Sequence, residues 1–178
     1  AGTATIYAEA IDESGISASC NVSVKSETPT AQNIIINEIQ SANIDMFIDP
    51  SFNYGGWVEL YNSTEQPVSL NYLYISDDAT NLTKYNLGKE RGIIPAKGYK
   101  VLWFDHCNAQ FPSQIDFKLD YDGGTIYISN SDGQLITSQD YPIAIPRTSY
   151  ARKSNGTGEW GRTSSPTPGE SNATSIFA

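Results

Sequence analysis

The sequence predicts an all-β protein built around an antiparallel β-sandwich, and three observations support that prediction. Aromatic residues make up 11% of the 178 residues, 11 of them Tyr, and β-branched residues are frequent. Such side chains fit a pleated, half-buried sheet surface. Short alternating segments recur between turns supplied by 14 Gly and 9 Pro, as in sandwiches and barrels. No segment sustains the period of an α-helix.

The first expected element is a β-hairpin at the N-terminus. Residues 4–11 and 17–25 both alternate apolar and polar side chains, which is typical of half-buried strands. Between them lies Asp12-Glu13-Ser14-Gly15, in which Gly permits the positive φ of a turn. An isolated hairpin leaves its apolar face uncovered, so this face is expected to need a partner.

The main domain is expected after a linker at residues 28–32, which is polar and contains Pro29. Six segments of this domain have strand character: 34–39, 57–62, 72–76, 99–104, 125–129 and 135–138. The last two are joined through Asp132-Gly133, a pair that favours a tight hairpin turn. Short strands at this spacing indicate a sandwich or a barrel.

A set of landmark segments occurs in a fixed order in this domain. They are Ile36-Asn37-Glu38-Ile39, Trp57-Val58-Glu59-Leu60-Tyr61-Asn62, Leu73 with Ile75-Ser76-Asp77, Ile94-Pro95-Ala96-Lys97-Gly98-Tyr99, Phe117-Lys118-Leu119, Ile126-Tyr127-Ile128, Ser149-Tyr150-Ala151-Arg152, Trp160, and Pro166-Thr167-Pro168-Gly169 with Asn172. Together they resemble the lamin tail domain over residues 33–172, which leaves 173–178 as a tail. The resemblance implies an immunoglobulin-like antiparallel sandwich that makes protein contacts and carries no catalytic residues.

Residues 1–27 resemble the C-terminal end of a bacterial immunoglobulin-like domain of group 2. The resemblance lies in Gly2-Thr3-Ala4-Thr5-Ile6 and in the closing Val22-Ser23-Val24. It implies a surface protein of successive domains. The chain begins without an initiating Met or a signal peptide, so it is expected to be part of a longer protein. The unpaired edges of the short hairpin are expected to associate with the same hairpin of a neighbouring molecule.

The charge of the chain argues against nucleic acid as a partner. The formal net charge is −9, the pI is about 4.4, and Lys and Arg are scattered along the chain, so phosphate backbones would be repelled. An acidic surface suits a secreted or cell-surface module. No apolar run approaches the ~20 residues that span a bilayer, so membrane insertion is not expected either.

The few soft ligands argue against a metal centre. The chain has 1 His and 2 Cys, whereas a structural zinc site needs four nitrogen or sulfur ligands. His106 and Cys107 are neighbours that would point to opposite faces of an extended chain. No metal, cofactor or catalytic residue is therefore expected. A disulfide between Cys20 and Cys107 remains open, because its geometry cannot be derived from sequence.

Several carboxylates are candidate ligands for calcium. The loop acids Asp77, Asp78, Asp116, Asp120 and Asp122 are expected to be solvated. Weak calcium binding by them remains open, although no Asp-x-Asp-x-Asp-Gly loop is present.

Glu38 and Glu59 are expected on neighbouring strands. There they would be buried or half-buried and paired with Arg152 or Lys118, rather than face each other across a cleft like the acid pair of a glycosidase.

Strand alternation also predicts an aromatic outer face. With Val58 and Leu60 directed to the core, their neighbours on the same strand point outward, and the other strands follow the same rule. The expected binding residues are Trp57, Tyr61, Tyr72, Tyr74 and Tyr127. Rigid aromatics are typical of interfaces and sugar platforms. Cross-strand aromatic pairs also stabilise exposed sheets by about 0.2–1 kcal/mol each, so both interpretations remain open.

These expectations combine into a non-catalytic binding or tethering module of a secreted or cell-surface multidomain bacterial protein. Its partner would be a protein or an extracellular polymer or glycan. The alternative is a carbohydrate-binding module that uses Trp57, Tyr61, Tyr72 and Tyr74. An enzyme is the least favoured of the three classes.

Overall fold

The computed structural model describes residues 2–12, 14–24, 33–88, 92–106, 111 and 113–177. These described residues form β-strands, loops and short 3₁₀ turns, and they contain no α-helix. No helix in the described part of the chain is long and apolar enough to cross a membrane. The expected all-β fold is confirmed.

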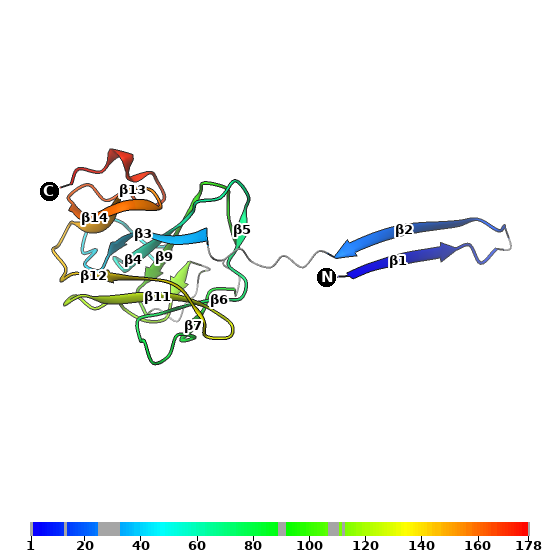
Figure 1. The fold of residues 1–178 in the computed structure, drawn as a ribbon, viewed down its shortest axis with the longest axis horizontal. Coiled ribbons are helices and arrows are strands. Elements are labelled where there is room, and N and C mark those ends of the chain that lie inside the picture. The colour runs from blue at the N-terminus through cyan, green and yellow to red at the C-terminus, as the bar shows by residue number, and fades with distance from the viewer. Residues whose placement is uncertain are drawn as a thin grey trace.

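Two packed sheets form an immunoglobulin-like β-sandwich (Figure 1). The larger sheet contains, in spatial order, β10 (Gln114–Ile115), β9 (Tyr99–Phe104), β4 (Gly56–Asn62), β3 (Ile34–Gln40), β13 (Ser149–Ser154) and β14 (Thr157–Thr163). The smaller sheet contains β12 (Leu135–Tyr141), β11 (Gly124–Asn130), β6 (Leu73–Ser76) and β7 (Tyr85–Asn86). A separate pair consists of β5 (Val68–Ser69) and β8 (Ile93–Ile94).

The expected strands of the main domain are all present close to their expected bounds. The pairings within the sheets are antiparallel, apart from the short parallel pair of β9 and β10. Gly133 in the turn between β11 and β12 has φ 72°, the left-handed region that an Asp-Gly turn requires. Sequence patterns did not identify β13 and β14 as strands, although their residues include family landmarks.

The hydrophobic core lies between the two sheets and is built by the expected alternation. Its inward side chains on β4, β6 and β11 are no more than 1% exposed: Val58, Leu60, Leu73, Ile75, Ile126 and Ile128. Burying each such side chain stabilises the fold by roughly 1.5–3 kcal/mol. Burial in the core therefore explains which side chains of these strands point inward.

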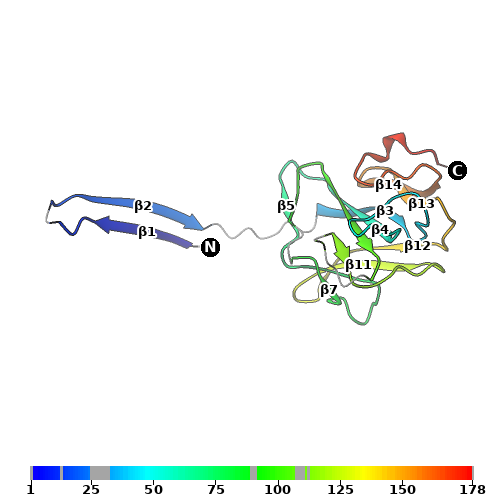
Figure 2. The same ribbon diagram turned by 180° about the vertical axis from the view of Figure 1, so that it is seen from behind.

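The outer face of β3 and β4 is buried as well, although the outer face of a sandwich sheet can be exposed to solvent. The residues on this face that are at most 1% exposed are Glu38, Gln40, Trp57 and Glu59. Two irregular segments cover them: loop 41–55 and residues 164–177, which we call the C-terminal strap. The strap includes the 3₁₀ turn η2 (Asn172–Thr174) and bridges back to β14 through Thr163 and Phe177. Figure 2 shows it on the β13 and β14 side of the sandwich.

The hairpin of β1 (Gly2–Glu9) and β2 (Ser17–Val24) forms as expected, with Gly15 at φ 69° in its turn. Directly paired residues share one face of an antiparallel ribbon. One face therefore carries only small or apolar side chains, from the pairs Ala4–Val22, Ile6–Cys20 and Ala8–Ala18. Ile6 is 60% and Val22 38% exposed, and in Figures 1 and 2 the ribbon stands apart from the sandwich. The expected linker at 28–32 lies outside the described residues.

Candidate functional site

The aromatic residues expected on one outer face belong to two different sheets. Trp57 and Tyr61 lie on β4 of the six-stranded sheet, whereas Tyr74 and Tyr127 lie on β6 and β11 of the four-stranded sheet. The alternation within each strand is correct. The outer faces of the two sheets of a sandwich, however, point in opposite directions. The single aromatic platform that the sequence suggested is therefore not formed.

Trp57 is buried rather than exposed, which is a second correction. Its side chain is 0% exposed, and its Nε1 donates to Oε1 of Gln40 at 2.7 Å. The ring of Phe47, from loop 41–55, meets the indole edge-on with centroids 6.1 Å apart. On the same strand, the half-buried Tyr61 packs on Tyr99 with centroids 5.2 Å apart. The covering loop thus turns the outer face of β4 into a second packed layer.

The remaining three tyrosines lie on or beside the four-stranded sheet. Tyr74 is half-buried, and its hydroxyl oxygen accepts from Nδ2 of Asn86 at 3.1 Å. Tyr127 is half-buried as well. Tyr72 precedes β6 in a turn, with φ 67° and 66% of its side chain exposed. It is therefore the most exposed residue of the expected set.

Glu38 and Glu59 are direct neighbours across β3 and β4, as expected. Both are 0% exposed. Oε1 of Glu59 accepts from Nδ2 of Asn37 at 2.8 Å, and its Oε2 accepts from the backbone N–H of Gly169 at 2.7 Å. Glu38 accepts from the hydroxyls of Ser149 and Thr167 and from the backbone N–H of Thr167. Both carboxylates therefore hold the C-terminal strap onto the sheet.

The environment of this pair favours the protonated forms. Burial raises the pKa of Glu59 to about 8, and the nearby Glu38 adds to the increase, while the hydrogen bonds from Asn37 and Gly169 oppose it. Burial also raises the pKa of Glu38, against the hydrogen bonds from Ser149 and Thr167. The strap encloses both carboxyls instead of leaving them on a cleft, so the arrangement suits a structural role.

The expected ion pairs with Arg152 and Lys118 are wrong. Arg152 lies an odd number of residues from Ser149, which reaches Glu38, so it points to the opposite face of β13. There its Nε donates to the carbonyl of Ile36 at 3.0 Å and its guanidinium lies 5.0 Å from the ring centroid of Trp160. Lys118 is exposed and lies at the end of the sandwich. Neutral donors of the strap, Thr167 and Gly169, contact the two carboxylates in place of the expected cations.

The other candidate ligands do not assemble into a metal centre. No group of three or more His, Cys, Asp or Glu side chains suited to a metal occurs in the part of the chain that is described. Nδ1 of His106 lies 3.2 Å from Oδ1 of Asp116, and both side chains are exposed. Cys107 lies outside the described residues, so the Cys20–Cys107 disulfide stays a prediction.

The loop acids considered for calcium have local partners. Asp77 pairs with Lys84 at 2.6 Å. Asp78 and Asp120 accept backbone N–H groups of Thr80 and Asp122 within their own turns. These contacts are those of solvated turn residues.

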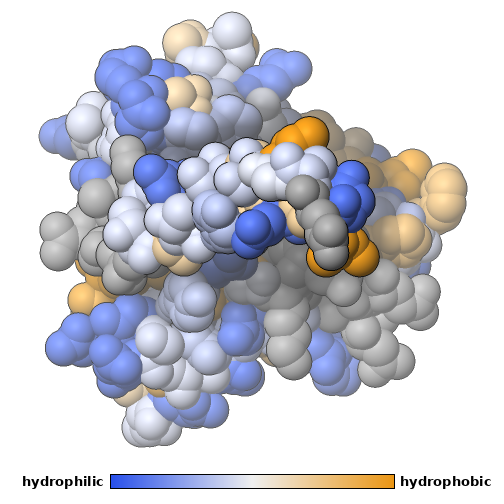
Figure 3. All heavy atoms as spheres, turned by 90° about the vertical axis from the view of Figure 1, so that its right-hand side faces the viewer, coloured by the Kyte–Doolittle hydropathy of each residue, from blue (hydrophilic) through white to orange (hydrophobic). Residues whose placement is uncertain are grey.

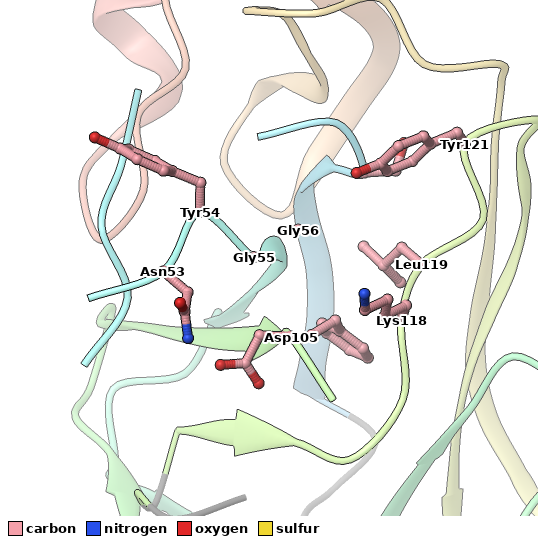
Figure 4. A pocket seen from close by; sticks show the side chains of 10 residues that line it. Asn53, Tyr54, Gly55, Gly56, Asp105, Lys118, Leu119 and Tyr121 are labelled. Atoms are coloured by element: carbon pink, nitrogen blue, oxygen red, sulfur yellow. The ribbon is translucent and has the colours of Figure 1, made fainter. Parts of the chain in front are cut away.

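A pocket of about 270 Å³ opens at the end of the sandwich where β3 ends and β4 begins. Tyr54 and Tyr121 flank it on opposite sides, and Asn53, Asp105 and Lys118 supply polar groups between them (Figure 4). Aromatic walls with a few convergent polar groups are typical of small-ligand sites. This pocket is one candidate site in the described chain.

Two glycines shape the pocket wall. A Cβ on Gly55 would lie 2.8 Å from Cβ of Asp105, and one on Gly56 would lie 2.9 Å from the carbonyl oxygen of Ser41. Only glycine allows these close approaches. The Gly55-Gly56 pair in the sequence thus marks the point where loop 41–55 closes against β9 and β3.

Exposed apolar side chains occur on the loops at this end of the sandwich. We call the surface of loops 41–55, 119–123 and 142–148 the loop end. Its apolar residues that are 47–87% exposed are Ile44, Ile48, Phe52, Ile143 and Ile145. Arg147 pairs with Asp45 across two of these loops, and the backbone N–H of Ala144 donates to the carbonyl of Tyr121 at 2.7 Å. These residues were not predicted from the sequence. The only signal for them is the occurrence of isolated Ile and Phe residues in polar loops.

The side of the molecule that carries the hairpin looks different. In Figure 3, hydrophilic and intermediate residues predominate there, and the hydrophobic ones appear in small separate groups. The loop end lies at the other end of β3, because that strand starts near the hairpin and finishes at loop 41–55.

Comparison with known proteins places most of the chain in one family. The model of the Lamin Tail Domain matches residues 27–142. The matched range ends before β13, so the last two strands of the six-stranded sheet and the C-terminal strap lie outside it. Neither the curated proteins nor the solved structures contain a match.

Proposed function

Because this chain belongs to the lamin tail domain family, we propose that it is a non-catalytic binding or tethering module. Its partner is a protein or an extracellular polymer, and the module positions the domains beside it. The parent protein is a secreted or cell-surface multidomain protein of a bacterium.

The loop end is the observation that carries this proposal. Phe52 is 87% and Ile143 59% exposed, and the ion pair of Asp45 and Arg147 joins the two loops that carry them. Large exposed apolar patches mark interaction sites rather than ordinary surface. Phe52 also has φ 62°, a conformation that is strained for a bulky residue. A rigid sandwich that presents such loops at one end is a common design of binding domains.

The hairpin supports the proposed location at the cell surface. We read it as the last two strands of a bacterial immunoglobulin-like domain of group 2, on the strength of its residues and of its uncovered apolar face. In proteins made of successive domains, such a hairpin packs against the rest of its own domain. When it lacks those strands, its apolar face and open edges favour association with the same hairpin of a second molecule.

A carbohydrate ligand is the second candidate, and the pocket is the observation that favours it. Tyr54 and Tyr121 are 46% and 59% exposed, which allows their rings to stack on a sugar. Asn53, Asp105 and Lys118 line the same space and supply donors and acceptors for hydroxyl groups. This assignment replaces Trp57, Tyr61, Tyr72 and Tyr74 as the sugar-binding residues.

Binding by three variants tests both candidates. The Phe52→Asn/Ile143→Ser variant removes the apolar loop end, and the Tyr54→Ala/Tyr121→Ala variant removes the pocket walls. Tyr72→Asn is the matched control, because Tyr72 is also an exposed aromatic residue with positive φ and Asn tolerates that conformation. Each protein is applied to a glycan array and to isolated cell-surface proteins and polymers.

The proposal expects at least a tenfold loss of binding to a protein or polymer partner in the Phe52→Asn/Ile143→Ser variant and no change in Tyr72→Asn. Specific retention on glycans that is lost only in Tyr54→Ala/Tyr121→Ala supports the carbohydrate alternative. Binding that survives both double variants contradicts the assignment of the loop end.

A further inference from the structure

Asp49 in loop 41–55 is a buried carboxylate with one oxygen that lacks a donor. Its side chain is 3% exposed. Oδ1 accepts the backbone N–H groups of Ser51 at 2.8 Å and Asn53 at 2.9 Å. Oδ2 is buried, and no hydrogen bond reaches it from the described residues. A buried carboxylate oxygen without a partner is costly, so something is expected to satisfy it.

A second carboxylate lies against the first. Burial raises the pKa of Asp49, and so does Asp105, whose carboxylate is within hydrogen-bonding reach. Asp105 follows β9, and its Oδ2 accepts from Nε2 of Gln114 at 2.8 Å. Gln114 is 0% exposed, so this end of the pair is anchored in the interior. Two carboxylates from distant parts of the chain therefore lie against each other, and one of them, Asp105, lines the pocket.

The donors around the pair are arranged for two charged carboxylates. Backbone N–H groups donate to Asp49 and the side-chain amide of Gln114 donates to Asp105, and hydrogen bonds of this kind stabilise the ionised form. Two adjacent negative charges in a buried site repel each other strongly. A positive ion between them removes that repulsion and satisfies Oδ2 of Asp49 in a single step, whereas a proton would neutralise only one charge.

We propose that Asp49 and Asp105 bind a calcium ion between them, beside the pocket that Asp105 lines. All the ligands are oxygens, which calcium and magnesium prefer. Calcium accepts irregular sets of six to eight oxygens and readily includes water. Asp105 lines the open pocket (Figure 4), which gives the ion a route of entry and leaves room for water ligands.

The ion would fasten loop 41–55 to the end of β9. Asn53 and Tyr54 follow Asp49 within that loop and line the same pocket, so the site would fix their positions. This inference does not depend on the proposed binding role, because ion binding is measured without any partner or glycan. The calcium expectation from sequence concerned other acids, and Asp49 and Asp105 are too far apart in the chain to form a recognisable loop motif.

Thermal unfolding of the full chain tests the site. With calcium at about a hundredfold over its Kd, the melting temperature should rise by about 5–10 °C relative to the protein in EDTA. The Asp49→Asn and Asp105→Asn variants should lose that increase. Asp132→Asn, an exposed acid in the β11–β12 turn, is the control and should keep it.

Terbium luminescence gives a second measurement that does not depend on the stability of the variants. Tb³⁺ substitutes for Ca²⁺, and Tyr54 and Tyr121 beside the pocket should sensitise its emission. The expected result is emission that calcium displaces in the wild-type chain. No emission and no change in melting temperature at millimolar calcium would overturn the proposal, as would a calcium response that persists in Asp49→Asn. A larger rise with magnesium than with calcium would overturn the choice of ion.

Discussion

The hairpin and the sandwich are built from the same alternating pattern but differ in what covers them. In the hairpin, one face carries only Ala, Ile, Val and Cys side chains, and Ile6 on that face is 60% exposed. In the sandwich, Leu60 on β4 is 0% exposed, and so is Glu59 on the opposite face of the same strand. Among the described residues, no second layer covers the apolar face of the hairpin. The central strands of the sandwich, in contrast, are covered on both sides.

The difference teaches that alternation predicts which side chains share a face, but not what lies over that face. Covering layers come from segments distant in the chain, such as the C-terminal strap over β3 and β4. In the hairpin, the neighbouring pairs stabilise only each other. Stability should therefore be concentrated in the sandwich, and the following measurements test that contrast.

The largest expected effect comes from a matched pair of core and hairpin substitutions. Leu60→Ala should lower the free energy of unfolding by about 2–5 kcal/mol, because it leaves a cavity between two packed sheets. Ile6→Ala should change it by less than about 0.5 kcal/mol. Denaturant titration measures both. If Ile6→Ala costs as much as Leu60→Ala, the hairpin face is covered and the contrast fails.

The second expected effect is a pH dependence that arises in the sandwich. The pKa of Glu59 is raised from 4.5 to about 8 in the folded chain, so its stabilising contribution is complete below about pH 4.5 and is lost as the pH rises through about 8. One proton corresponds to a slope of at most about 1.4 kcal/mol per pH unit. Unfolding curves between pH 5 and 8 measure it.

Glu59→Gln supplies the control for this pH dependence, because its amide does not titrate. The difference between wild type and variant isolates the Glu59 contribution from other acids, and the variant should show a weaker decline in stability with pH. An equal slope in the two proteins would mean that the pKa of Glu59 is close to normal in the fold.

A smaller effect is expected from the buried indole of β4. Trp57→Phe removes the hydrogen bond to Gln40 and leaves a buried amide oxygen without a donor, which costs about 1–3 kcal/mol. Tyr7→Phe on the hairpin, where Tyr7 is 62% exposed, is the matched change and should cost almost nothing. If Trp57→Phe leaves the free energy of unfolding unchanged, the outer face of β4 is less tightly covered than described.

The smallest effect on stability is expected from removal of the hairpin itself. A chain that begins at Gln32 should melt within about 1 °C of the full chain, because no described sandwich residue depends on the ribbon. Light scattering should show that the full chain associates and that the shorter chain is monomeric. Equal sizes with an ordered hairpin would rule out the proposed pairing between molecules.

Much of the fold was predictable because it rests on local pattern. The inward residues Val58, Leu60 and Ile75 follow from period-two alternation, and the turn at Gly133 follows from its Asp-Gly pair. The neighbouring positions of Glu38 and Glu59 were also predictable, because both occupy recognisable strand motifs. These features need no knowledge of distant segments.

The candidate site was less predictable because irregular loops, whose paths the sequence pattern does not predict, decide what covers each strand. Trp57 occupies an outward position, yet Phe47 and Gln40 bury it. Asp49 and Asp105 belong to separate loops, so neither residue stands out alone. The apolar residues of the loop end are single Ile and Phe side chains in irregular segments, and only the fold brings them together.

The position of β13 has a consequence for how the chain reaches its folded state. This strand pairs with β3, the first strand of the sandwich, and Ser149 meets Glu38 across 111 residues of sequence. Contacts between such distant segments carry a high loop-closure cost before they are repaid, so they slow folding. During synthesis from the N-terminus, β3 and β4 are made first. Glu38 and Glu59 therefore stay uncovered until β13, β14 and the C-terminal strap have been synthesised. Folding of the sandwich is thus expected to be completed only after the last strands have been synthesised.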